Sequence, residues 1–256
     1  MKIAYFWENE FDMKTKIALL LLIPFLGISQ IKILDDLKKK VPAKSSQGLS
    51  SLSSTDISKG LKEALNKGIE KQVSKLTATD GFYKNELVKI LLPEELQKVD
   101  KTLRKMGMSD LADEGVLLLN RAAEEAVKES TPIFIDAVKN MSFTDAKNIL
   151  MGKENAATTY LQSSTTNPLY AKFSPVIQSS LAKVGADKVW ATIIKKYNSI
   201  PLVAKVNPNL TDYTTNKALQ GVFTMIALEE KDIRTQLSAR TSPLLQKVFA
   251  LQDKKS

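Results

Sequence analysis

Apolar residues recur at helical spacing along most of the chain, and Leu111–Lys128 (LADEGVLLLNRAAEEAVK) shows this pattern most clearly. At about 100° per residue, one half of this helix carries apolar or small side chains and the other half carries the charged ones. The apolar half consists of Leu111, Gly115, Leu118, Leu119, Ala122, Ala123, Ala126 and Val127. So wide an apolar face predicts a helix with several neighbours, around which the rest of the chain is organised.

Further helices are predicted from the same periodicity and from capping and breaking residues. They cover residues 56–76, 93–106, 131–141, 142–152, 155–164 and 167–184, with others beginning at Asp187, Thr211 and Ser242. Asp56 and Thr211 are the predicted N-caps of their helices, and Ser142 followed by Asp145 resembles a capping box. Pro175 is expected to kink the helix that contains it.

Residues 77–92 form the least helical stretch, and Phe82 and Tyr83 within it are expected to dock onto the core. No convincing strand pattern is found. We therefore predict the all-α class, as a compact bundle of about ten helices without a significant sheet. Residues 56–252 are predicted to form a single helical domain, preceded over 30–55 by a short helix and a Ser-rich linker.

The first 29 residues have the organisation of a signal peptide. Met13–Lys16 supplies a basic start, the apolar run Ile17–Ile28 follows, and cleavage is expected after Ser29. This run is shorter than the ~20 residues that span a membrane, so no transmembrane span is expected after cleavage. Residues 1–12 are expected to lie upstream of the true start. We therefore predict export to the periplasm or cell envelope of a Gram-negative bacterium, with an uncleaved anchor as the alternative.

The chain contains no Cys and no His. Disulfides, thiol nucleophiles, Ser-His-Asp triads and imidazole metal ligands are thereby excluded, and neither a metal nor a cofactor is expected. The net charge is +9, but only four of the 37 basic residues are Arg, which sequence-specific nucleic-acid readers favour. We predict no specific nucleic-acid partner. A solvated Lys-rich surface is the first interpretation of this charge, and weak attraction to an anionic surface or a glycan is the second.

A candidate polar site lies on the organising helix. Asn120 is at the edge of the apolar arc, and Arg121 is spaced to pair with Glu124 or Glu125. Asp136 or Asp145 is expected to join them if a neighbouring helix covers that side. Two interpretations stay open, namely a salt-bridge network between helices and a pocket for an anion or another small ligand.

The last long predicted helix carries a second candidate set, consisting of Asp212, Tyr213 and Lys217. Glu229 and Glu230 are adjacent on that helix, but neighbouring helical side chains diverge by about 100° and do not form a carboxylate dyad on their own. No Gly-rich phosphate loop is present in the sequence.

Several long strings in the chain resemble the domain of unknown function 4197 family. They include GLKEALNKGIEKQVSKL, DGFYKN, LLPEELQKVDKTLRKMGM, LNRAAEEA, FTDAKNIL, AATTYL and NPNLTDYTTNKALQGVF. The resemblance runs from about Ser53 to Leu251. It implies a bacterial, exported, helical protein and brings no established activity. Many relatives look like lipoproteins or carry ordinary signal peptides, and this chain lacks the Cys that a lipoprotein needs.

We interpret the chain as an exported cell-envelope protein with a non-enzymatic binding or structural role. Its most concrete form holds a small apolar ligand between helices, as the small residues Gly115, Ala122 and Ala126 on the organising helix and the loop aromatics indicate. An anionic ligand is the other option. One alternative is a hydrolase or lyase that uses carboxylates and Tyr, which needs a cleft where they converge. Another is a protein–protein interaction module, which needs an exposed apolar patch. The sequence leaves the oligomeric state open.

Overall fold

The computed structural model describes residues 52–253, except 106, 108, 184 and most of 186–208. All described residues belong to one unit, Leu49–Ser256. The predicted signal peptide, most of the predicted linker, and nearly all of the helix predicted from Asp187 lie outside the described residues.

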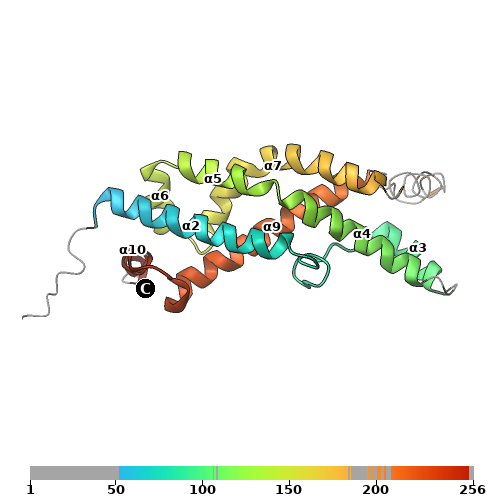
Figure 1. The fold of residues 1–256 in the computed structure, drawn as a ribbon, viewed down its shortest axis with the longest axis horizontal. Helices are drawn as coiled ribbons and strands as arrows, with labels where there is room; N and C mark the ends of the chain where they lie inside the picture. Colours follow the sequence, from blue (N-terminus) through green and yellow to red (C-terminus); the bar gives the residue numbers. More distant parts are fainter. Residues whose placement is uncertain are drawn as a thin grey trace, which may run out of the picture. The chain divides into compact units, whose positions relative to one another are not determined.

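The regular elements of the described residues are all helical, which confirms the all-α class (Figure 1). The described helices are fewer than the ten or so expected, partly because one helix covers residues that were predicted to form two, 155–164 and 167–184. They are α2 (Ser54–Thr77), α3 (Glu94–Lys105), α4 (Ser109–Val127), α5 (Ser130–Asn140), α6 (Phe143–Leu150), α7 (Ala156–Lys183), α9 (Leu210–Thr235), the short 3-10 helix η1 (Leu237–Ala239) and α10 (Pro243–Asp253). None of the helices in this part of the chain has both the length and the apolar character to cross a membrane.

Two long helices, α2 and α9, contact each other and most of the other elements. α9 packs against α2, α4 and α7, and α2 also packs against α5, α6 and α10. α4 has several neighbours, as its wide apolar face predicted, since it contacts α2, α3, α7 and α9. However, α9 has buried side chains along nearly its whole length, from Leu210 to Arg234, so α4 is not the sole organising helix.

Residues 156–183 form one continuous helix, α7, although Pro168 was predicted to begin a new one. A proline inside a helix costs ~3 kcal/mol, because a backbone N–H is lost and the ring crowds the preceding turn. Burial of one large apolar side chain returns about 1.5–3 kcal/mol. α7 buries a residue at every fourth position, namely Ala157, Leu161, Thr165, Leu169, Phe173, Ile177 and Leu181. This stripe outweighs the two prolines.

The capping box predicted at the start of α6 is confirmed. The Asp145 N–H donates to Ser142 Oγ at 3.1 Å, and the Ser142 N–H donates to Asp145 Oδ2 at 3.0 Å. Two hydrogen bonds thus satisfy donors that the first helical turn leaves without a helical partner.

The N-caps of α2 and α9 differ from the predicted ones. Ser53 rather than Asp56 caps α2, and Asp56 is instead its capping-box partner in the first turn. Asn209 rather than Thr211 caps α9, with its side chain accepting from a backbone N–H of the first turn. In each case the helix begins two or three residues earlier than predicted, and the Ser or Asn at that earlier position caps it.

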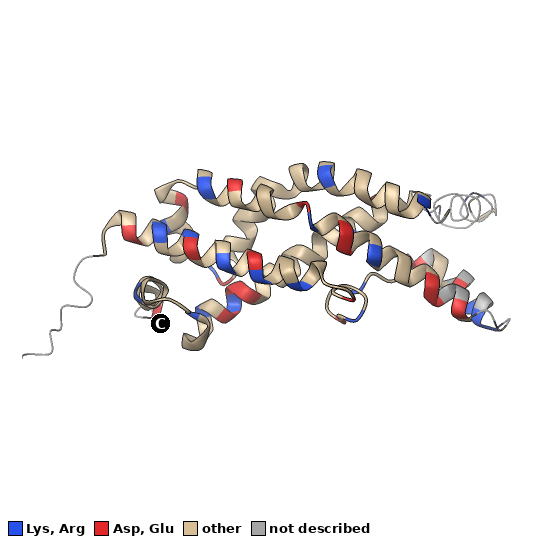
Figure 2. Ribbon diagram, in the orientation of Figure 1, with Lys and Arg blue, Asp and Glu red and all other residues tan. Residues whose placement is uncertain are grey.

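Charges of both signs are interspersed along α2, whereas α7 carries few (Figure 2). The two charged side chains of α7, Lys172 and Lys183, are both exposed. The exposed side of α7 is therefore polar but mostly uncharged.

Candidate functional site

Residues 78–92 form an irregular segment that lies against α4 and α9. Phe82 is fully buried at 0% exposure, which confirms its predicted docking onto the core. Its ring contacts α9 at Gly221, where an added Cβ would lie only 2.7 Å from Phe82 Cε1. Tyr83 is half-buried, and the Lys89 ammonium lies 4.7 Å from the centre of its ring. The two aromatic residues therefore fix the segment to the helices.

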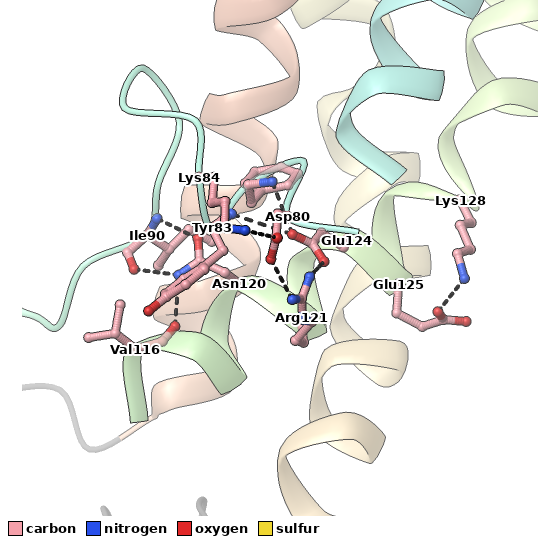
Figure 3. Close-up of polar contacts among 11 residues, drawn as sticks. Asp80, Tyr83, Lys84, Ile90, Val116, Asn120, Arg121, Glu124, Glu125 and Lys128 are labelled. Atoms are coloured by element: carbon pink, nitrogen blue, oxygen red, sulfur yellow. Dashed lines mark hydrogen bonds and ion pairs between the residues drawn. The ribbon is translucent and has the colours of Figure 1, made fainter. Parts of the chain in front are cut away.

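Asn120 of α4 holds the far end of this segment (Figure 3). Its side chain is fully buried and binds both backbone groups of Ile90, accepting from the N–H at 2.8 Å and donating to the carbonyl at 2.8 Å. It also donates to the Val116 carbonyl at 2.7 Å. Both amide protons and the amide oxygen of Asn120 are used within the protein.

Glu124 of α4 holds the near end of the same segment. Its Oε1 accepts from the backbone N–H groups of Phe82 at 3.1 Å and Tyr83 at 3.4 Å. Its Oε2 accepts from Arg121 Nη1 at 2.6 Å, and Arg121 Nη2 donates to Asp80 Oδ1 at 2.5 Å (Figure 3). The structure thus brings Asn120, Arg121 and Glu124 together, and the element that covers them is a loop rather than a neighbouring helix.

The charges in this cluster, which we call the loop latch (Asp80, Asn120, Arg121 and Glu124), stabilise one another. The pKa of Asp80 lies below its ordinary value because its carboxylate accepts hydrogen bonds from Lys84 and Arg121. The pKa of Arg121 is raised, first by its hydrogen bond to Glu124 and then by the one to Asp80. Asp80 and Arg121 therefore stay ionised around neutral pH and anchor the loop.

The Asp80→Asn variant is expected to be less stable than the wild type at neutral pH, with a difference that shrinks as the pH falls below 3.8. The folded pKa of Asp80 is lower than its ordinary value, so its carboxylate stabilises the fold above that value and loses this effect as it is protonated. Urea unfolding at a series of pH values measures the difference. Asp136→Asn is the control, because it alters an exposed carboxylate that forms no ion pair with the residues that the structure describes. A difference that stayed constant in acid would contradict the assignment.

Asp136 and Asp145 do not join Arg121. Asp145 is the capping-box residue of α6, and its hydrogen bonds with Ser142 lower its pKa. Asp136 is exposed on α5, where it lines a surface groove between α5 and α7. Because residues 78–92 occupy the polar side of α4 near Arg121, these two carboxylates lie elsewhere.

The second candidate set, on α9, is joined to other elements by its aromatic and carboxylate groups. Tyr170 of α7 donates to Asp212 Oδ1 at 2.6 Å, and this hydrogen bond raises the Tyr170 pKa. Tyr213 donates to the Leu91 carbonyl at 2.8 Å. The Lys217 ammonium lies 5.9 Å from the centre of the Tyr213 ring. These contacts connect α9 to α7 and to residues 78–92.

Sequence reasoning missed a buried network near the C-terminal end of α9, which begins at Glu230. The Glu230 carboxylate accepts from the backbone N–H groups of Ala157 at 2.9 Å and Thr158 at 2.8 Å, and from Thr158 Oγ1 at 2.8 Å. These N–H groups lie in the first turn of α7, where no helical carbonyl is available to them. Glu230 therefore caps α7 from outside that helix.

Arg234 lies one helical turn after Glu230 and caps the C-terminal end of α6, where it donates to backbone carbonyls. Its Nη2 donates to the Ile149 carbonyl at 2.8 Å, and its Nη1 donates to the Leu150 carbonyl at 3.3 Å. The same guanidinium is 2.8 Å from the Glu230 carboxylate. A carboxylate at one helix N-terminus and a guanidinium at a neighbouring C-terminus both match the helix dipoles.

Arg240 extends the network to the end of α9 itself. Its side chain is buried and donates to the carbonyls of Ile233 at 3.0 Å and Arg234 at 2.9 Å. Arg240 Nη1 also lies 2.6 Å from Asp253 Oδ2 of α10, and the two side chains form an ion pair. The hydrogen bonds from Arg240 lower the pKa of Asp253. We call Glu230, Arg234 and Arg240 the capping network, because each of them satisfies backbone groups at a helix end.

Glu229, the neighbour of Glu230, points to α2. Its carboxylate accepts from Lys71 Nζ at 2.7 Å and from Gln72 Nε2 at 2.5 Å. Glu229, Glu230 and Arg234 also line a cavity of about 30 Å³ between α2, α7, α9 and α10. This volume suits one or two water molecules.

A larger hollow lies on the surface between α5 and α7, and we call it the α5–α7 groove. Its volume is about 620 Å³. Its walls combine apolar and polar side chains, among them Ile133, Asp136, Ala137, Tyr160, Ser164 and Lys172. Burial raises the pKa of Tyr160, and the Asp145 carboxylate raises it further. No set of three or more acidic side chains in the described part of the chain is placed to hold a metal ion.

These features define an all-α protein in which buried charges cap helix ends and hold a loop, with an open groove between two helices. Residues 51–250 match the family described as "Protein of unknown function (DUF4197)". The match covers more than half of the chain, so the chain belongs to this family, and the resemblance seen in the sequence is confirmed. No curated protein and no solved structure matches the chain.

Proposed function

We propose that the chain is an exported, non-enzymatic binding protein of the bacterial cell envelope, and that its ligand lies in the α5–α7 groove. The groove, at about 620 Å³, is the observation that carries this proposal. Small-molecule sites are typically hollows of about 300–1,000 Å³ with apolar walls and a few polar groups.

The size of the other cavity restricts where a ligand can lie. The cavity beside Glu229 and Arg234 has only about 30 Å³, too little for an organic molecule. An apolar ligand buried in that part of the core would have to displace packed side chains, at a cost that close packing makes high. The open groove needs no such rearrangement.

The use of the buried charges supports a binding role over hydrolysis. Glu124 and Glu230 each accept backbone N–H groups in addition to a guanidinium, so their oxygens hold the fold together. A general acid or base must instead reach the proton that it transfers. The carboxylates that do reach the groove, such as Asp136, are exposed.

Export is supported by the signal-peptide pattern of residues 1–29. In this proposal the mature chain begins at Gln30 and meets its ligand outside the inner membrane. The groove and the leader are independent observations, so each can fail without the other.

Native mass spectrometry of the protein purified from the envelope fraction tests both parts. We expect a mass that begins at Gln30 and an adduct that dissociates on collision. Ser164→Trp places an indole in the groove and is expected to abolish the adduct. Ser163→Trp is the matched control, because Ser163 is exposed, bonds the same Tyr160 carbonyl and does not line the groove.

Two results would overturn the proposal. An adduct that survives Ser164→Trp would place the ligand elsewhere, and wild-type protein without any adduct would remove the support for binding. A full-length mass in the cytosolic fraction would overturn export alone.

A further inference from the structure

A second hollow adjoins the α5–α7 groove, and Tyr160 lines both. The second hollow has a volume of about 290 Å³ and lies where α6 is followed by α7. On α7 the lining residues of the groove run from Tyr160 to Lys172, which at 1.5 Å per residue is ~18 Å. The two hollows therefore form an elongated surface that passes the Tyr160 side chain.

Three of the polar side chains along this surface are not used within the described part of the fold. The side chains of Asp136 and Asn140 in the groove, and of Asn148 in the second hollow, make no hydrogen bond within the described residues. This contrasts with Asn120 and Glu124, whose polar atoms bind backbone groups. Each asparagine amide offers two donor protons and an acceptor oxygen, so it can serve one hydroxyl as donor and another as acceptor.

A proline in α7 leaves one backbone carbonyl at the groove wall without its usual helical donor. Pro168 lines the groove within α7 and has no N–H to donate to the Ser164 carbonyl one turn earlier. Ser164 lines the groove as well. The helix thereby leaves a backbone acceptor without its helical donor at this wall.

The charges along both hollows almost cancel. They comprise Glu129, Asp136, Asp145, Lys153 and Lys172, that is, three negative and two positive side chains. A net charge so close to zero favours neither a strong anion nor a strong cation. The walls also include Ile133, Ala137 and Tyr160, whose apolar surfaces suit the C–H faces of a ligand rather than its polar edge.

We infer that the ligand is a neutral oligosaccharide, which lies along both hollows with a sugar ring against Tyr160. This inference rests on the proposed binding function and names its ligand class. The paired hydroxyl groups of an oligosaccharide can bind the carboxylate and amide side chains, and its elongated form fits the elongated surface. An oligosaccharide without charge also fits a surface whose own charges almost cancel.

Isothermal titration calorimetry of the full-length mature protein tests the inference with cellotetraose, maltotetraose and chitotetraose. We expect saturable binding of at least one of them. Asp136→Ala and Asn140→Ala are each expected to weaken it about tenfold, the effect of one lost hydrogen bond to a ligand. Both side chains are exposed and make no hydrogen bond to the described residues, so both variants are expected to fold. Asp110→Ala, an exposed carboxylate outside both hollows, is the matched control.

Hexane-1,6-diamine, inorganic phosphate and 1-octanol serve as charged and apolar comparison probes. If one of these binds in an Asp136- or Ser164-dependent manner and the tetrasaccharides do not, the oligosaccharide assignment is wrong and the groove function stands. If no probe binds and the envelope-purified protein carries no adduct, both the assignment and the proposed function fail. Tetrasaccharide binding that Asp136→Ala and Asp110→Ala affect equally would also overturn the assignment.

Discussion

The Arg234→Leu variant is expected to lose about 3–5 kcal/mol of the free energy of unfolding, because it leaves a buried carboxylate without its charged partner. Arg234 is 5% exposed and binds Glu230 together with two carbonyls at the end of α6. Leu fills a similar volume but donates no hydrogen bond. The variant thus leaves three buried acceptor groups less satisfied at one place.

Urea unfolding monitored by circular dichroism measures this loss, and a double-mutant cycle isolates its cause. The double variant Glu230→Leu/Arg234→Leu is expected to lose less free energy of unfolding than the two single variants lose together. Removing both charges leaves no unpaired charge in the core. Lys231→Leu, a change at an exposed neighbour on α9, is the control. Strict additivity of the two single losses would show that the pair is not coupled.

The Phe82→Ala variant is expected to lose about 3–5 kcal/mol, the usual cost of truncating a fully buried Phe. The ring fills the space over Gly221, so its removal leaves a cavity between residues 78–92 and α9. The same unfolding measurement checks the value. Leu87→Ala in the same segment is expected to stay within about 0.5 kcal/mol, because Leu87 is 65% exposed. A loss below about 1 kcal/mol for Phe82→Ala would mean that the segment does not depend on this anchor.

Local signals in the sequence predicted the helix faces and several helix ends. The capping box at Ser142 was found because its partner lies only three residues away. The helices predicted over 93–106 and 167–184 are each followed directly by a glycine, Gly107 and Gly185, and both have positive φ, +76° and +68°, which glycine adopts without steric cost. Signals of this kind depend on neighbours within one helical turn.

The break predicted at Pro168 shows where local reasoning ends. Proline at a first helical position is common, and Asn167-Pro168 resembles such a start. The sequence also contains the opposing signal, an unbroken series of mostly apolar residues at every fourth position of α7. Its weight comes from burial against α4, α5 and α9, which no local rule includes.

The candidate site was predictable in its α4 half only. Asn120, Arg121 and Glu124 share a side of one helix, but their partners Asp80, Phe82 and Ile90 lie 30 to 42 residues earlier in the chain. Glu230 and Arg234 have the spacing of an ordinary surface ion pair. Only the packing of α6 and α7 against the rest of the fold distinguishes them from a solvent-exposed pair.

The capping network also determines how this corner of the protein can open. Helix termini ordinarily fray on their own, since their last turns have few interactions to lose. Here the start of α7, the end of α6 and the end of α9 are bound by Glu230, Arg234 and Arg240, all within eleven residues of one another in the chain. None of these ends can fray without breaking a bond to this short stretch, so the corner opens as a single cooperative unit.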